Sequence, residues 1–414
     1  MEKTNGILSL DLGANSIHGV IAKINEEKKI EILSANTYFS DGVKNGVISD
    51  IGAAKFTVDK FLENIEEFDI DTVDIISAVR GSLIDVVSAN ARIKINDDEE
   101  TGTVTGTVTE KTMIEIEKRL AEANKIDDTK EIIEIIPQQY KIDEQPVQNP
   151  EQMIGKFLEL KALMICGTKS NITNIIQTTR GNTLKYGYSS IAEELVSNDD
   201  KDLGCILVDM GGMTTGIVVY VEGKIKDSFE LPFGSDYISR DIAAKLKITK
   251  KEATNIKEKY GVILEELIDD PAKEIEYNIG GNRTQKVKMK ELVDVINPNV
   301  ATQLKEISKA FAKRGISPAD FVGGFILTGG GSLLKGMPEA FSKVFNGALS
   351  KIANFTENDF ICKEDNINII NSQLYTTALA VLKSNYKSHL TFNIQSYQNN
   401  SIWEKIKNFF KNFK

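Results

Sequence analysis

Two aspartate–glycine turns carry the residue types that bind phosphate and a divalent cation. In CILVDMGGMTTGIVVY (residues 205–220), an apolar run leads into Asp209, two glycines and two threonines before a second apolar run. Glycine permits positive φ and lets backbone N–H groups approach a ligand, and such groups form an anion-binding concavity. A neighbouring carboxylate can hold a divalent cation. By itself, the stretch fits an ordinary glycine hairpin equally well.

A second copy of the pattern favours phosphate binding. In ILSLDLGANSIHGVIA (7–22), an apolar strand leads into Asp11, a glycine follows two positions later, and Ser16 precedes a returning apolar strand. Repeated units far apart in the chain predict two similar halves that face one cleft. A third glycine cluster, FILTGGGSLLKG (325–336), follows another apolar strand. Together the three stretches predict a nucleotide site whose phosphates are held from both sides.

Length and composition predict a soluble protein with at least two lobes. The 414 residues are 41% hydrophobic and 27% charged, and the net charge of −10 argues against general nucleic-acid binding. Three widely spaced cysteines and two histidines argue against disulfides, a zinc site and a Ser-His-Asp triad. No apolar run reaches the roughly eighteen residues of a spanning helix, and the N-terminus lacks a signal-peptide core. We therefore expect a cytosolic chain.

The order of strands and helices predicts an α/β protein with an insertion. Strands and one helix up to residue 79 fit a mixed sheet, whereas the threonine-rich start of 83–163 changes character. That segment is either a subdomain with its own partners or a variable elaboration. The predicted parts are a first lobe (1–82, continued at 164–198), the inserted subdomain (83–163), a second lobe (199–261), a small subdomain (262–310), the second lobe with a return to the first (311–384), a linker (385–400) and a terminal helix (401–414).

The last segment, SIWEKIKNFFKNFK, has the pattern of an interfacial membrane anchor. Its apolar side chains form one helical stripe, and lysines occupy most of the rest. The alternative is a helix that docks onto the body of the protein. One such helix binds a membrane reversibly, so stable attachment favours self-association. The residues expected at the membrane are Ile402, Trp403, Lys405, Ile406, Phe409, Phe410, Lys411 and Phe413.

Several stretches resemble one family over nearly the whole chain. IIEIIPQQYKID followed by QNP, the helix start GSDYISRDIAAKL, the turn FILTGGGSLLKG and the amphipathic tail are similar to segments of the FtsA family. That family belongs to the superfamily of actin, sugar kinases and heat-shock chaperones. The tail and the insertion distinguish it from actin and MreB.

The resemblance implies an α/β, two-lobed actin-like ATPase fold, with duplicated mixed-sheet lobes and the inserted subdomain in the first lobe. It implies ATP in the cleft with Mg²⁺ on Asp11 and Asp209. The expected nucleotide-binding residues are Asp11, Gly13, Asn15, Ser16, Asp209, Gly211, Gly212, Met213, Thr214, Thr215, Gly234, Lys257, Gly329, Gly330, Gly331 and Ser332. Taken by itself, Lys257 also fits a solvated charge on a helix.

The resemblance also implies a role in cell division and septum formation. The chain would tether the FtsZ ring to the cytoplasmic face of the inner membrane as a peripheral protein. It would bind the C-terminal peptide of FtsZ through residues 262–310, contact later division proteins through the insertion, and self-associate into filaments.

Some positions depart from the family pattern. Met213 and Gly216 stand where a third glycine and a later aspartate are usual, and Thr254 replaces an acid before Lys257. These departures predict nucleotide binding with weak ATPase activity at most, and no general base can be named.

Asn299 stands where the family has a basic residue after the proline of the FtsZ-binding helix, so the resemblance leaves the contact to other residues, such as Arg283 or Lys290. Two other functions share the fold: a PilM-like pilus-assembly platform, which lacks the anchor helix, and a small-molecule kinase, which needs an acidic base in a closed pocket.

Overall fold

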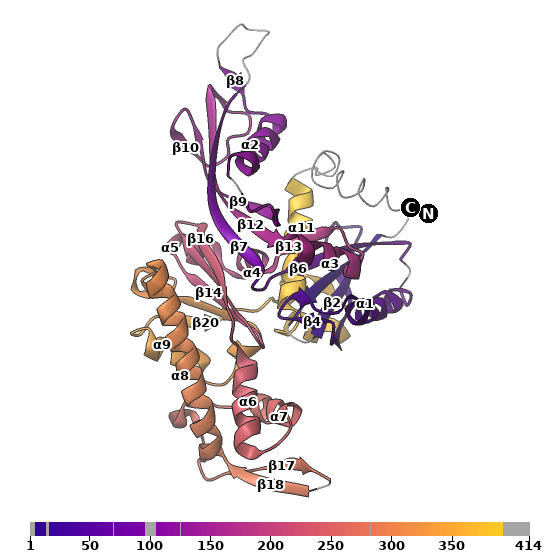
Figure 1. Cartoon of the computed structure of the whole chain (residues 1–414), viewed down its shortest axis with the longest axis vertical. Coiled ribbons are helices and arrows are strands. Elements are labelled where there is room, and N and C mark those ends of the chain that lie inside the picture. The colour runs from indigo at the N-terminus through magenta and orange to yellow at the C-terminus, as the bar shows by residue number, and fades with distance from the viewer. Residues whose placement is uncertain are drawn as a thin grey trace.

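The computed structural model describes residues 5–13, 16–68, 70–95, 105–124, 126–281 and 283–391, which form two lobes with an inserted subdomain at one end (Figure 1). The first lobe has a six-stranded sheet in the order β13-β6-β1-β2-β3-β21, and the second has a five-stranded sheet in the order β16-β15-β14-β19-β20. The strands of the first sheet are β1 (Asn5–Leu12), β2 (Ser16–Ile24), β3 (Ile30–Phe39), β6 (Thr72–Val79), β13 (Thr183–Tyr186) and β21 (Ile361–Cys362). Those of the second are β14 (Ile206–Met210), β15 (Thr215–Val221), β16 (Lys224–Leu231), β19 (Phe325–Thr328) and β20 (Ser350–Ile352).

The two sheets repeat one topology. In each, a central strand pairs antiparallel with the next strand of the chain and parallel with a later one: β1 with β2 and β6, and β14 with β15 and β19. This repetition confirms the predicted duplication of mixed-sheet lobes. One apolar cluster includes Val20 of β2 and Leu207 of β14, so the lobes share part of their core.

Helices cover both faces of the first sheet, because alternate side chains of its strands point to opposite faces. Leu8 and Leu10 of β1 pack in one cluster with Phe61 of α1 (Ile51–Ile65) and Ile175 of α3 (Lys169–Thr179). On the other face lie α4 (Gly187–Leu195) and α11 (Thr376–Thr391). The spacing of apolar residues in α1 predicts that Ile51 and Phe61 both face the core. Phe61 is buried, but Ile51 at the start of the helix is 39% exposed.

The insertion is a four-stranded sheet with one helix. The sheet order is β10-β9-β12-β7, and Ile116 and Leu120 of the helix pack against Leu158 and Leu160 of β12. The elements are β7 (Ile84–Lys94), α2 (Glu110–Ala123), β9 (Lys130–Ile142), β10 (Gln145–Val147) and β12 (Phe157–Thr168), with a small pair β8 (Gly106–Thr107) and β11 (Ile154–Gly155).

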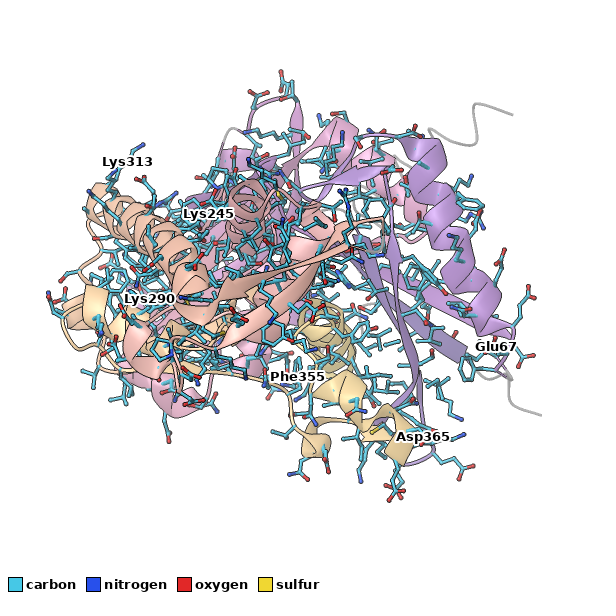
Figure 2. All side chains as sticks on the ribbon, turned by 90° about the horizontal axis from the view of Figure 1, so that it is seen from below. Glu67, Lys245, Lys290, Lys313, Phe355 and Asp365 are labelled. Atoms are coloured by element: carbon cyan, nitrogen blue, oxygen red, sulfur yellow. The ribbon has the colours of Figure 1, made fainter. Side chains whose placement is uncertain are left out.

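The far end of the second lobe carries helices and a hairpin (Figure 1). Viewed from below, Lys245, Lys290 and Lys313 of this lobe lie on one side and Glu67 and Asp365 of the first lobe on the other (Figure 2). The elements are α6 (Ser235–Leu246), α7 (Lys250–Tyr260), β17 (Glu274–Gly280), β18 (Arg283–Lys288), α8 (Met289–Arg314) and α9 (Met337–Val344). Short elements elsewhere are β4 (Val43–Lys44), β5 (Val47–Ile48), α5 (Asn198–Leu203) and α10 (Ile367–Ile370).

Three local expectations were wrong. A proline inside a helical pattern predicts an interruption at Pro298 of a helix over 289–314. Helix α8 instead runs unbroken through Pro298, because Ile296 and Val300 beside it are buried, and packing offsets the lost hydrogen bond. Residues 385–391, predicted as linker, continue α11. Thr249 followed three residues later by Glu252 predicts a capping box at the start of α7. Thr249 accepts from the Glu252 N–H, but the Glu252 carboxylate accepts from the Asn278 N–H instead of completing the box.

Two further points concern the membrane. Over the residues that the structure describes, no helix is long and apolar enough to span a bilayer. The predicted anchor helix at 401–414 and the linker from residue 392 lie outside those residues.

Candidate functional site

The two aspartates face the same cleft because they occupy equivalent positions. Asp11 lies near the carboxyl end of β1, next to Ala78 of β6, and Asp209 lies near that of β14, next to Thr328 of β19. Ligand sites of open α/β sheets lie at such strand ends. Asp11 and Asp209 are 2% and 4% exposed, respectively.

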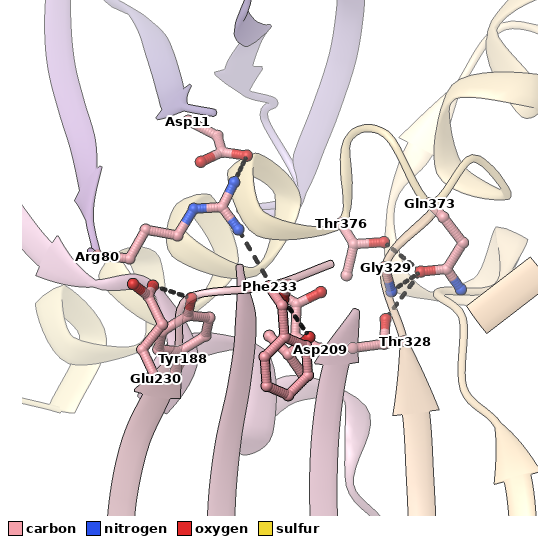
Figure 3. Close-up of polar contacts among 11 residues, drawn as sticks. Asp11, Arg80, Tyr188, Asp209, Glu230, Phe233, Thr328, Gly329, Gln373 and Thr376 are labelled. Atoms are coloured by element: carbon pink, nitrogen blue, oxygen red, sulfur yellow. Dashed lines mark hydrogen bonds and ion pairs between the residues drawn. The ribbon is translucent and has the colours of Figure 1, made fainter. Parts of the chain in front are cut away.

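A residue that the sequence interpretation missed joins them. The guanidinium of Arg80, directly after β6, donates from Nη2 to Asp11 Oδ2 at 2.6 Å and from Nη1 to Asp209 Oδ2 at 3.3 Å (Figure 3). Asp11 and Arg80 belong to the first lobe and Asp209 to the second, so this ion pair crosses the cleft. The sequence feature that could have identified Arg80 is its position immediately after an apolar strand, at the edge of the sheet where the aspartates lie.

Burial and charge act against each other in this triad. Burial raises the pKa of Asp209 to about 6, although the nearby Arg80 guanidinium favours its ionised form. Burial opposes the charge of Arg80, but Asp11 and the neighbouring acidic groups raise its pKa above the ordinary value. Arg80 is therefore a permanent cation between the two acids.

The acid pair does not fit a divalent cation as it is arranged here. Both Oδ2 atoms accept from Arg80, and only Asp11 Oδ1 is buried without a hydrogen-bond partner. Mg²⁺ takes six oxygen ligands in near-ideal octahedral geometry, and at phosphate sites one or two carboxylates contribute beside waters and phosphate oxygens. Here both carboxylates are engaged by Arg80. Among the described residues, no group of three or more His, Cys, Asp or Glu side chains is placed to hold a metal ion.

The two predicted phosphate turns have the same backbone geometry. The Gly13 N–H donates to Ser16 O at 2.8 Å, and the Gly211 N–H donates to Thr214 O at 2.9 Å. Asn15 lies outside the described residues. The Ser16 hydroxyl shares a hydrogen bond of 3.0 Å with His18 Nε2.

The space between the turns is small. About 20 Å³ is open to water-sized groups, lined by Leu12, Gly13, Asn45, Gly46, Arg80, Gly211, Gly212, Met213, Thr214 and Glu230. This is room for roughly one water molecule. Met213 lies at the cleft, with its sulfur 3.4 Å from an Arg240 nitrogen, whereas the buried Thr215 hydroxyl donates to Phe233 O. A triphosphate would need the lobes further apart.

The unusual Gly216 has a structural reason. A Cβ at this position would come within 2.0 Å of the ring of Tyr188, which lies on α4 of the first lobe. The Tyr188 hydroxyl donates to Glu230 Oε2 at 2.5 Å, and Glu230 pairs with Gly216 across β15 and β16 (Figure 3). Burial raises the pKa of Glu230. Glu230 therefore places a carboxyl group beside Gly216, where the family pattern has an aspartate, but this group comes from the neighbouring strand.

The third glycine cluster closes the site beside Asp209. Gly329 has a φ of 79°, and a Cβ there would meet Asp209 Oδ1. Its N–H and the Thr328 hydroxyl both donate to Gln373 Oε1 at 2.8 Å (Figure 3). The Ser332 hydroxyl donates to Gly329 O, so it serves the turn itself. Gln373 is a second residue that the sequence interpretation missed.

The start of α6 supports the second turn. The Ser235 and Asp236 N–H groups donate to Gly211 O and Gly212 O at 2.9 and 2.8 Å, and Gly234 is too close to these carbonyls for a side chain. These two N–H groups thus hold the turn in place and do not face open space.

Lys257 is buried, so its interpretation as a solvated charge is wrong. It is 7% exposed, and its Nζ donates to Ser235 O at 3.2 Å. Burial lowers its pKa. Thr254, in place of the expected acid, donates to the Ser239 hydroxyl at 3.0 Å and ties α7 to α6.

Of the three residues considered for an FtsZ contact, two already bind neighbouring side chains. Asn299 donates to Asp241 Oδ2 at 2.6 Å, and Lys290 pairs with Glu265 at 2.8 Å and with Asp294 at 3.4 Å. Arg283 is exposed on β18.

Two mixed-sheet lobes with aspartate–glycine turns across one cleft define an actin-like ATPase fold. The chain is similar to a solved PilM-PilN type IV pilus biogenesis complex, at 14% identity and a TM-score of 0.59, over 91% of this chain and 98% of that one. It is also similar to MreB 5 of Spiroplasma citri bound to AMPPNP, at 12% identity and a TM-score of 0.53, over 96% and 99%.

Family comparisons are more specific. Residues 206–380 match the model of the cell division protein FtsA, and residues 81–166 match that of the SHS2 domain inserted in FtsA. The chain is 27% identical to FtsA of Borreliella burgdorferi, covering 83% of each chain, and 24% identical to FtsA of Bacillus subtilis, covering 80% of this chain and 74% of the relative. The chain belongs to the FtsA family of cell-division proteins.

Proposed function

We propose that this chain binds ATP between its lobes and acts as a self-associating tether of the FtsZ ring. The observation that carries the proposal is the pair of equivalent aspartate–glycine turns, at Asp11 and Asp209, on opposite sides of one cleft. The fold shared with a protein solved with AMPPNP supports it. Nucleotide binding would need the lobes to separate, so the role requires a conformational shift more than turnover.

Each part of the site would have a different task. The turns at Gly13 and Gly211 would hold the phosphates with backbone N–H groups, and Lys257 would approach the nucleoside. The glycine turn beside Gln373 would lie near adenosine. Replacing Asp209 by Ala should weaken ATP binding, and unchanged affinity in calorimetry would contradict the site.

The membrane part of the proposal depends on residues 401–414. Each lysine near an anionic leaflet contributes about 1 kcal/mol, and the apolar stripe adds burial. Deletion of 401–414 should abolish sedimentation with anionic liposomes. A second variant, Phe410→Glu, keeps the lysines but interrupts the apolar stripe, and it should also sediment poorly. Sedimentation of the deleted form would overturn the tether.

The FtsZ contact is tested with its C-terminal peptide. The full chain should be captured by an immobilised peptide, and Arg283→Glu should reduce capture, because that arginine is exposed on the hairpin of the second lobe. Lys224→Glu, an exposed lysine on β16, is the control. Capture of no protein at all would contradict the proposed partner. The insertion would contact later division proteins.

A further inference from the structure

The Arg80 guanidinium contacts both aspartates and also faces the cleft between the two phosphate turns. Its side chain is 14% exposed and contacts both aspartates, yet Arg80 also lines the cleft between the phosphate turns. The same cation therefore faces the acids and the space where a polyphosphate would lie.

The local backbone is shaped for this placement. Gly81 has a φ of 111° and packs against Asn45 O, and Gly46 has a φ of 74° and packs against Arg80 O. Side chains at either glycine would be strained and would collide with these carbonyls. The loop between β4 and β5 and the end of β6 thus fit together around the Arg80 backbone.

Arginine has the donors to bind phosphate at the same time. A guanidinium has five N–H groups in a planar fork, and the contacts to Asp11 and Asp209 use one on each terminal nitrogen. The remaining donors suit the oxygens of a phosphate, to which arginine binds in a fork-like geometry.

The negative charge of Asp11 and Asp209 makes a cation necessary between them and a bound polyphosphate. Two buried carboxylates at the floor of a cleft repel an anionic polyphosphate unless a cation lies between them. A divalent ion bound directly at Asp11 would compete with Arg80 for Oδ2, and this contact lies within the first lobe, so separation of the lobes does not by itself remove it. The fixed guanidinium supplies positive charge without occupying a coordination shell.

We propose that Arg80 is the resident cation of this site, so that the chain binds a nucleoside triphosphate without requiring a divalent metal ion. The proposal rests on the proposed nucleotide function and specifies its counter-ion.

Calorimetry with ATP on the full chain tests it, in excess EDTA and in excess MgCl₂. The wild-type affinity should differ by less than about threefold between the two conditions. Arg80→Gln should bind about tenfold or more weakly in EDTA, and MgCl₂ should restore part of the loss. Arg180→Gln, which removes an arginine paired with Asp59 away from the cleft, should behave as wild type.

A larger dependence of the wild type on MgCl₂ would overturn the proposal and leave the nucleotide site intact. Absence of ATP binding in both conditions would contradict the nucleotide site itself, and the proposal with it.

Mn²⁺ gives a readout without nucleotide. Electron paramagnetic resonance should show no tight Mn²⁺ site in the wild type and a new one in Arg80→Gln, which exposes the acid pair. A Mn²⁺ site in the wild type that disappears in Asp209→Asn would overturn the role of Arg80, whether or not ATP binds.

Discussion

The ring of Tyr188 in the first lobe lies directly against Gly216 in the second. No side chain larger than hydrogen fits between them, and the Tyr188 hydroxyl is held by Glu230 at 2.5 Å. Tyr188 is 1% exposed, so this contact is buried between the lobes. Separation of the lobes to admit a nucleotide must preserve this contact as a pivot or break it.

Gly216→Ala should destabilise the protein, because the new methyl group would overlap the Tyr188 ring. Overpacking of this kind costs about 1–3 kcal/mol. Chemical denaturation measures the loss. Gly52→Ala in the first turn of α1, where only the Asp50 side chain is near, should be neutral or slightly stabilising. Equal effects of the two substitutions would contradict the close packing.

Asp209 should make stability depend on pH. Its pKa in the folded protein, raised to about 6, lies above the ordinary value, so the folded state binds the proton more tightly. Its contribution is present below pH ~4 and is lost as the pH rises to ~6, by at most about 3 kcal/mol. Asp209→Asn should reduce the change of the denaturation midpoint with pH over this pH range. The exposed Asp199→Asn should leave the wild-type slope unchanged.

Lys257→Met should weaken ATP binding by about tenfold and should cost little stability, since methionine fills the buried space without a charge. Calorimetry and thermal unfolding separate the two effects. Lys259→Met, an exposed lysine on the same helix, is the matched control. Wild-type affinity in the Lys257 variant would exclude a nucleotide contact.

Glu117 in the insertion should destabilise the protein at alkaline pH. Burial raises the pKa of this part-buried carboxyl to about 7, so its contribution to stability falls as the pH rises from ~4.5 to ~7. Glu117→Gln should therefore gain about 1–2 kcal/mol at pH 8 and little at pH 5. The exposed neighbour Glu115→Gln should show no such difference in urea denaturation. A gain that does not depend on pH would point to packing instead of charge.

Features encoded within a few neighbouring residues were predictable. The strand–turn–strand units at Asp11 and Asp209 were identified because strand alternation and glycine turns are local signals, and both turns have matching hydrogen bonds at Gly13 and Gly211. The repetition of these units was enough to predict two lobes and a shared cleft.

Contacts between distant residues were not predictable. Arg80 is 69 and 129 residues from its two partners, and Gln373 is 44 residues from Gly329. No spacing rule links such positions, since folding alone decides which strand ends meet.

By itself, the sequence determined the strand periodicity, the glycine turns and the two acids, because each depends on local sterics and on burial of one face. Only the tertiary structure decided that a guanidinium joins those acids and that Tyr188 takes the space above Gly216. Arg80 with Asp209 and Tyr188 with Gly216 each join residues of different lobes, and their geometry exists only once the two sheets have packed together.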